Sequence, residues 1–201
     1  GFEKFMDIKV RQGGPKPDAV VVVCTVRGLK YHGGVDLKEL SKPDVDAVKM
    51  GTNNLRNAIH IVAMFGLEAI VAINRFPEDT PAELEAVKAA ALDANAKAVA
   101  EAKGFAEGGD GMTKLAAAVV EAADRPSDVK LLYNDDDSFF DKVEHMAKSL
   151  YLAGDVKWGP MTRTTARRFA DNGWNFPVCI AKTHLSISAD PKLKGAPSGH
   201  T

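Results

Sequence analysis

Apolar residues along the chain gather in continuous runs that lie between segments with helical periodicity. The longest runs cover Ala19–Thr25, Glu68–Ile73 and Pro177–Ala181, and the first is rich in β-branched residues without alternation. Runs of this kind are typical of strands buried on both faces of a parallel sheet. A shorter strand is predicted over Val129–Tyr133. The pattern therefore predicts an α/β fold, with a parallel sheet flanked by helices.

Helical periodicity and capping residues predict the segments between the strands. Thr80, Pro81 and Glu83 form a helix start with a capping box, and the alanine-rich helix that follows is expected to run to about Lys103. Gly104–Gly111 is a glycine-rich loop, and a helix follows it to about Asp124. Further helices are predicted over Asp44–Phe65, Ser138–Tyr151 and Met161–Asn172.

The order of strand, helix and strand predicts where the loops meet. A strand, a helix and a second strand with this spacing form a right-handed parallel crossover, so both strands end at the same edge of the sheet. This topology places Asn74–Asp79 beside Arg27–Gly34. Small molecules bind beyond the carboxyl ends of such strands, so this edge is the predicted site.

Composition narrows the class of protein without identifying it. The 201 residues include 45% hydrophobic residues and carry a net charge of -1, so neither a nucleic acid nor a membrane is indicated as a partner. No apolar run approaches the length of about 18 residues that a membrane span needs. We therefore expect a cytoplasmic or organelle-matrix protein. Cys24 and Cys179 lie in apolar runs, where buried thiols are expected.

The segment after the first strand holds the residue types that bind anions. Arg27, Lys30 and His32 are followed by Gly33 and Gly34, and glycines let backbone N–H groups approach oxygen atoms closely. A turn with solvated charges explains the same residues. The acidic run Asp135–Asp137 has two explanations as well, a divalent cation site or the start of a helix. Gly104–Gly111 lacks the phosphate-loop pattern.

Several segments, taken together, resemble one family. VCTVRGLKYHGG at Val23–Gly34 resembles the signature of formate–tetrahydrofolate ligases, with Cys24 in place of the usual alanine. Other similar segments are EKFMDIK, KPDAVVVV, Asn54–Leu55, Phe65–Gly66, VAINRFPEDT, AEGGDG, PVCIAKT and SADPKLKGAPSGHT. The resemblance implies a nucleotide-binding domain like that of P-loop NTPases, of which residues 1–75 are the C-terminal part. Residues 76–176 would form a smaller α/β domain with the pterin-site loops, and residues 177–201 would begin a third domain or form a return segment.

The resemblance also implies a reaction and its ligands. The family joins formate to tetrahydrofolate at the expense of ATP, with formyl phosphate as intermediate, and the ATP is used with Mg²⁺. A requirement for a monovalent cation stays open. The family's phosphate loop lies in a preceding segment that this sequence lacks, so we expect a partial chain that does not turn over alone. Its partners would be the small-molecule substrates and the missing segment, or a chain that carries this segment.

Site residues carry over position by position. Phe76 and Pro77 match one wall of the family's pterin slot, and Phe105 stands where the family has the tryptophan of the other wall. Arg27, Lys30 and His32 would line the catalytic side toward ATP and formyl phosphate. Nucleotide-binding positions would be Thr25, Gly33, Gly34, Lys182 and Thr183.

Two acidic residues depart from the family pattern at the slot. Glu101 replaces an apolar residue and Glu107 stands where lysine is common. Together with Phe105, these departures leave an alternative open, a non-catalytic folate-binding or scaffold subunit derived from the ligase. A second alternative applies to Phe76 and Phe105, which could be packed loop residues.

Overall fold

A computed structural model of the chain describes residues 1–180, 187–190, 192–193 and 195–201. It divides into two compact units, Pro17–Val129 and a second unit that combines Gly1–Lys16 with Lys130–Thr201. The predicted division at residues 75 and 176 stays a prediction. Within the described residues, no helix combines the length and the apolar character that crossing a membrane requires.

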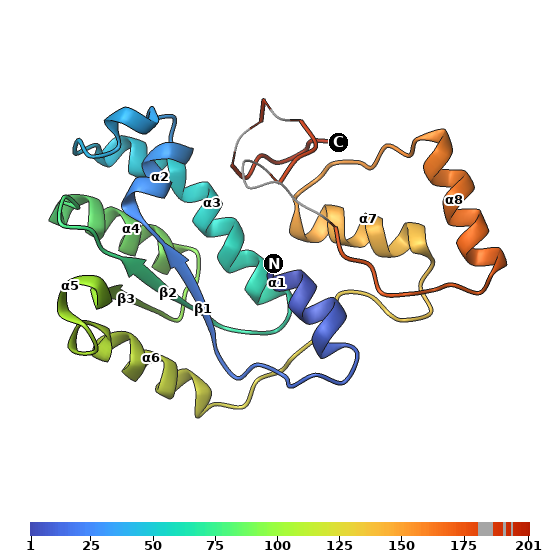
Figure 1. Cartoon of the computed structure of the whole chain (residues 1–201), viewed down its shortest axis with the longest axis horizontal. Helices are drawn as coiled ribbons and strands as arrows, with labels where there is room; N and C mark the ends of the chain where they lie inside the picture. The colour runs from blue at the N-terminus through green and yellow to red at the C-terminus, as the bar shows by residue number, and fades with distance from the viewer. Residues whose placement is uncertain (181–186, 191, 194) are drawn as a thin grey trace. The chain divides into compact units, whose positions relative to one another are not determined.

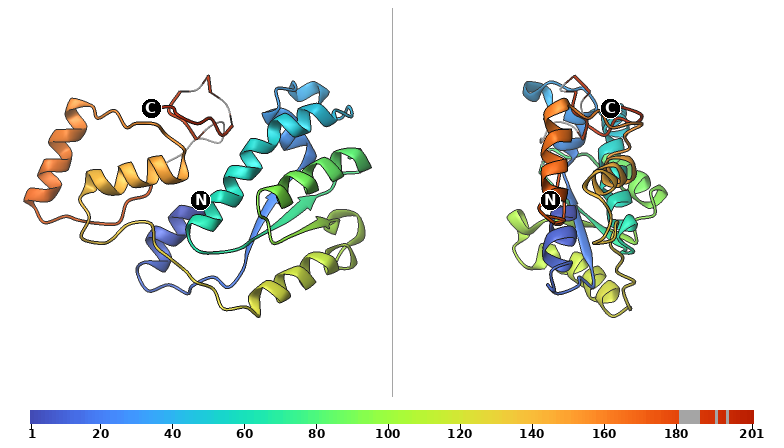
Figure 2. Two further views of the ribbon diagram at one scale, coloured as in Figure 1. Left: turned by 180° about the vertical axis from the view of Figure 1, so that it is seen from behind. Right: turned by 90° about the vertical axis from the view of Figure 1, so that its right-hand side faces the viewer.

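The unit Pro17–Val129 is built on a three-stranded parallel sheet in the order β1-β2-β3. The arrows of the three strands point the same way in Figures 1 and 2, which confirms the predicted parallel crossover. Its elements are β1 (Val20–Cys24), α2 (Val26–His32), η2 (Leu37–Glu39), α3 (Val45–Met64), β2 (Ala69–Asn74), α4 (Pro81–Asp93), β3 (Ala98–Ala102), α5 (Gly104–Glu107), η3 (Asp110–Met112) and α6 (Thr113–Ala123).

The central strand is β2, and β1 lies at an edge. All but the last residue of β2 are buried, whereas Val21 and Val23 of β1 are 38% and 66% exposed. The prediction that the first strand is buried on both faces is therefore wrong for this structure. The reason is that α6 packs mainly on β3, so within the described residues one face of β1 is left uncovered.

The alanine-rich segment does not continue as a helix to Lys103. Helix α4 begins with the predicted capping box and ends at Asp93, and Asn95 then adopts a positive φ of 64°. Residues Ala98–Ala102 form β3 instead, in parallel register with β2. Alanine tolerates both conformations, and the open edge of β2 offers hydrogen bonds that favour the strand.

Two glycines allow α2 and α3 to pack closely. A Cβ atom at Gly33 would overlap the carbonyl oxygen of Ala47, and one at Gly51 would overlap the carbonyl oxygen of Leu29. Helix α3 begins at the cap Asp44, whose carboxylate accepts a hydrogen bond from the Ala47 amide at 2.8 Å. The predicted helix over Asp44–Phe65 is thus confirmed.

The second unit consists of helices and irregular segments. Its elements are α1 (Phe2–Lys4), the π-helical segment η1 (Phe5–Val10), α7 (Phe139–Leu150) and α8 (Pro160–Asp171). The last two confirm the predicted helices. Ser138 caps α7 by accepting a hydrogen bond from the Asp141 amide, so the acidic run is not the cap. Asp137 instead closes a turn by accepting a hydrogen bond from the Asn134 amide.

The strands predicted over Val129–Tyr133 and Pro177–Ala181 do not form in the described residues. The hydroxyl of Tyr133 donates to the carbonyl oxygen of Val178 at 3.0 Å and accepts from its amide at 2.8 Å. One side chain therefore satisfies both backbone groups of Val178, and a strand ladder would have to compete with it. The guanidinium of Arg11 lies 4.0 Å from the centre of the same ring.

Candidate functional site

The carboxyl ends of the three parallel strands carry the residues of the candidate site. Strand β1 leads into Thr25 and α2, β2 leads into the loop Arg75–Thr80, and β3 leads into Lys103 and α5. Because the strands are parallel, these three connections lie at one edge of the sheet. The structure thereby brings together segments that are far apart in the sequence.

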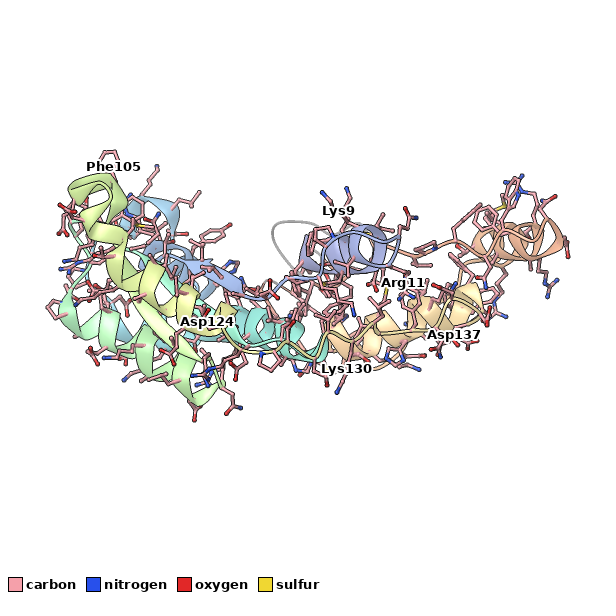
Figure 3. The ribbon with its side chains drawn as sticks, turned by 90° about the horizontal axis from the view of Figure 1, so that it is seen from below. Lys9, Arg11, Phe105, Asp124, Lys130 and Asp137 are labelled. Carbon is pink, nitrogen blue, oxygen red and sulfur yellow. The ribbon has the colours of Figure 1, made fainter. Side chains whose placement is uncertain are left out.

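A largely apolar pocket of about 450 Å³ lies at this edge. It brings together the three residues predicted for the pterin slot, Phe76, Pro77 and Phe105. The ring of Phe105 is fully exposed, and Figure 3 shows it projecting from the end of α5. The alternative that Phe105 is a packed loop residue is therefore wrong. The complete lining is Asn74, Arg75, Phe76, Pro77, Lys103, Phe105, Ala106 and Glu107.

Basic residues neutralise the two unexpected acids beside this pocket. The carboxylate of Glu101 lies 2.7 Å from the guanidinium of Arg75, and that of Glu107 lies 3.4 Å from the ammonium group of Lys103. Both pairs are partly exposed, so each contributes little to stability. The pairs matter for the pocket, because neither carboxylate presents an unpaired negative charge to a ligand.

The loop after β2 is held by a buried carboxylate. Asp79 accepts a hydrogen bond from the Phe76 amide at 2.8 Å, and burial raises the pKa of this carboxyl. Arg27 lies over the Phe76 ring at 4.9 Å from its centre and pairs with Glu78 at 3.2 Å. These contacts confirm the predicted approach of Asn74–Asp79 to Arg27–Gly34.

Lys30 points into the core of its unit, where its side chain is buried. Its ammonium group lies 3.0 Å from Glu83 and donates to the carbonyl oxygen of Lys42 at 2.9 Å. Burial by itself would raise the pKa of Glu83, but hydrogen bonds from Asp44, Thr80 and Lys30 hold it at about 2. In this structure Lys30 joins α2 to the start of α4, and its catalytic role stays a prediction.

His32 lines a second, smaller pocket beside β1. This pocket has a volume of about 250 Å³, and burial lowers the pKa of the imidazole. The Nδ1 atom of His32 is buried and has no hydrogen-bond partner among the described residues. Thr25 and Cys24 also line the pocket, and burial raises the pKa of the Cys24 thiol to about 12. The thiol is therefore protonated at neutral pH.

The predicted nucleotide-binding positions have structural roles of their own. The Thr25 hydroxyl caps α2 by accepting a hydrogen bond from the Gly28 amide at 2.9 Å. Gly33 ends α2 against α3, and Gly34 has a φ of 99°, which favours glycine. Lys182 and Thr183 lie outside the described residues. A nucleotide-binding role stays a prediction for all five positions.

Sequence reasoning missed the residues that support the slot. Asp79 follows Phe76 by three positions, and its carboxylate reaches back to the Phe76 amide. No local signal pairs Arg75 with Glu101, because Arg75 follows β2 and Glu101 lies in the neighbouring strand β3. The described residues contain no group of three His, Cys, Asp or Glu side chains suited to a metal ion.

The matches to known proteins extend over the whole chain. Residues 1–201 match the family model described as formate–tetrahydrofolate ligase. A protein of that name from Roseiflexus sp. (strain RS-1) is 46% identical over 210 residues, which cover 100% of this chain and 37% of the relative. Ligases of the same name from Desulforamulus reducens and Staphylococcus aureus (strain Newman) are 41% and 44% identical and are covered over 37% and 36% of their lengths. The chain thus spans little more than a third of the curated relatives it matches.

Proposed function

The chain belongs to the formate–tetrahydrofolate ligase family, and on this premise we propose that it supplies the pterin slot and one wall of the nucleotide site of an ATP-dependent ligase. A formate oxygen attacks the terminal phosphorus of ATP, ADP leaves, and formyl phosphate forms. The N10 amine of tetrahydrofolate then attacks the formyl carbon, phosphate leaves, and the amine loses its proton. The products are 10-formyltetrahydrofolate, ADP and phosphate.

The observation that carries this proposal is the pocket between Phe76 and Phe105. A planar heterocycle is well held between aromatic faces, and the exposed ring of Phe105 has no packing role of its own. Pairing of Glu101 with Arg75 and of Glu107 with Lys103 removes the main electrostatic objection to folate binding at this place. The slot residues bind and orient the pterin, so that the N10 amine of the same tetrahydrofolate molecule meets the activated formyl group.

On the nucleotide side, the proposal assigns different roles to three residues. The half-buried imidazole of His32 faces the small pocket at the end of β1 and is the residue best placed to meet a phosphate group there. Thr25 lines the same pocket and caps the start of α2, and Gly33 ends that helix. Phosphoryl transfer needs further phosphate ligands, so we expect no turnover from these residues by themselves.

A titration of tetrahydrofolate into the purified chain tests the slot. We expect binding in the wild type and a clear loss in Phe105→Ala, because that substitution removes one stacking face. The matched control is Phe176→Ala, since Phe176 is also highly exposed but belongs to the other unit. Absence of binding in the wild type, or equal loss in both variants, would sink the proposal.

The alternative, a non-catalytic folate-binding or scaffold subunit, is favoured by Phe105 in place of tryptophan. The two functions separate when the chain is supplied with a phosphate-loop segment from a relative. A ligase then forms product that depends on ATP, formate and tetrahydrofolate together. A scaffold subunit binds tetrahydrofolate without forming product.

A further inference from the structure

We propose that Arg27 is a positioning residue of the tetrahydrofolate slot, whose guanidinium group supports the ring of Phe76 on which the pterin stacks. This inference rests on the proposed function of the slot. It assigns to Arg27 a role different from the phosphate contact that the sequence predicts.

The contact geometry places Arg27 behind one wall of the pocket. Its guanidinium carbon lies 4.9 Å from the centre of the Phe76 ring, within the range of a cation–π interaction. Phe76 lines the pocket of about 450 Å³, whereas Arg27 does not. The cation therefore contacts the ring from outside the space that a ligand would occupy.

The described hydrogen bond of Phe76 holds its backbone and leaves its ring to be oriented by other contacts. Asp79 binds the Phe76 amide at 2.8 Å, and Pro77 restricts the backbone on the other side. Neither contact fixes the side-chain torsions. The facing ring of Phe105 is fully exposed, so it does not hold Phe76 in place either. Among the described residues, Arg27 makes a cation–π contact with this ring and can help to fix its orientation.

Glu78 in turn holds Arg27. Its carboxylate lies 3.2 Å from the guanidinium, and it follows Phe76 by two positions in the same loop. One loop therefore supplies both the ring and the carboxylate that keep Arg27 in place. Arg27 lies in the first turn of α2, which follows β1, and the loop follows β2, so parallel pairing of the strands brings the two together.

The test compares Arg27→Met with a matched arginine variant. Arg56 has the same side-chain exposure of 38% and also forms an ion pair, with Asp93 at 2.6 Å, but among the described residues the cation over the Phe76 ring is Arg27. We expect Arg27→Met to weaken tetrahydrofolate binding about three- to tenfold, and Arg56→Met to leave it unchanged. Arg27→Lys keeps a cation over the ring and is expected to retain most of the affinity.

A double-mutant cycle separates positioning from other effects. If Arg27 acts through Phe76, Arg27→Met adds no further loss in a Phe76→Ala background. Losses that multiply in the double variant, or unchanged binding in Arg27→Met, would overturn the inference while leaving the slot itself intact. If the wild-type chain does not bind tetrahydrofolate at all, the proposed function fails and this inference fails with it.

Discussion

The ammonium group of Lys30 lies 3.0 Å from the carboxylate of Glu83, and both side chains are withdrawn from solvent. The pair joins α2 to the start of α4, and Glu83 also completes the capping box of α4 with Thr80. A charge that loses its partner in such a place is costly, because water cannot replace the lost contact.

Replacing Lys30 by methionine should therefore destabilise the fold strongly. We expect the free energy of unfolding to fall by about 3 to 5 kcal/mol in Lys30→Met, since Glu83 is left buried without its cation. Urea denaturation measures this change. Lys88→Met is the control, because Lys88 is exposed and pairs only loosely with Glu85 at 3.7 Å. A stable Lys30→Met protein would mean that the lysine serves a ligand and not the fold.

The lowered pKa of Glu83 predicts that the fold loses stability in acid. The folded-state pKa of Glu83 is about 2, below the ordinary value of 4.5. Its contribution is thus present above about pH 4.5 and is lost as the pH falls toward 2. Denaturation series over this pH range should show a steeper decline in the wild type than in Glu83→Gln. Parallel curves for the two proteins would contradict the assignment.

The raised pKa of Asp7 predicts the opposite pH dependence of the free energy of unfolding, in a different pH range. Burial raises its pKa from 3.8 to about 6, although the hydrogen bond and charge of Arg11 lower it. The folded state therefore binds the proton more tightly, and the contribution of Asp7 to stability is lost as the pH rises from about 4 to 6. Asp7→Asn should flatten this part of the stability curve. If stability depends on pH in the same way in Asp7→Asn, another group is responsible for the titration.

A larger aromatic side chain in place of Phe105 should bind tetrahydrofolate more tightly. Tryptophan offers a larger face than phenylalanine, so Phe105→Trp is expected to tighten tetrahydrofolate binding about two- to tenfold. Its emission should change on binding, because the indole would lie in the pocket. Trp158 and Trp174 belong to the other unit and provide a constant background. Equal affinity and unchanged emission would argue against a ligand at this ring.

The hydroxyl of Tyr133 should hold the segment around Val178. Tyr133→Phe leaves the amide and the carbonyl oxygen of Val178 without their partner, which is expected to cost about 1 to 3 kcal/mol. Hydrogen exchange at the Val178 amide is the direct measurement, and the variant should exchange faster. Unchanged protection would mean that another group already satisfies this amide.

Much of the fold could be predicted from local patterns. The capping residues Asp44, Thr80 and Glu83 mark helix starts because their side chains bond to backbone groups only a few positions away. The apolar runs of β1 and β2 likewise predicted parallel strands, and their shared edge brought Phe76 toward Arg27. In each case the deciding interactions are local, or they follow from the handedness of one crossover.

Tertiary structure decided the rest. The segment Ala98–Ala102 reads as helix, yet it forms a strand because the edge of β2 supplies hydrogen bonds that no local pattern records. The partners of Lys30 and Glu101 are likewise set by packing, since Glu83 and Arg75 approach them only after the sheet has formed. The sequence alone thus determined the starts of α3 and α4 and the parallel crossover, and the family resemblance supplied the aromatic residues that line the pocket. Burial and strand pairing decided which charges serve the fold and which face the site, because both depend on residues distant in the chain.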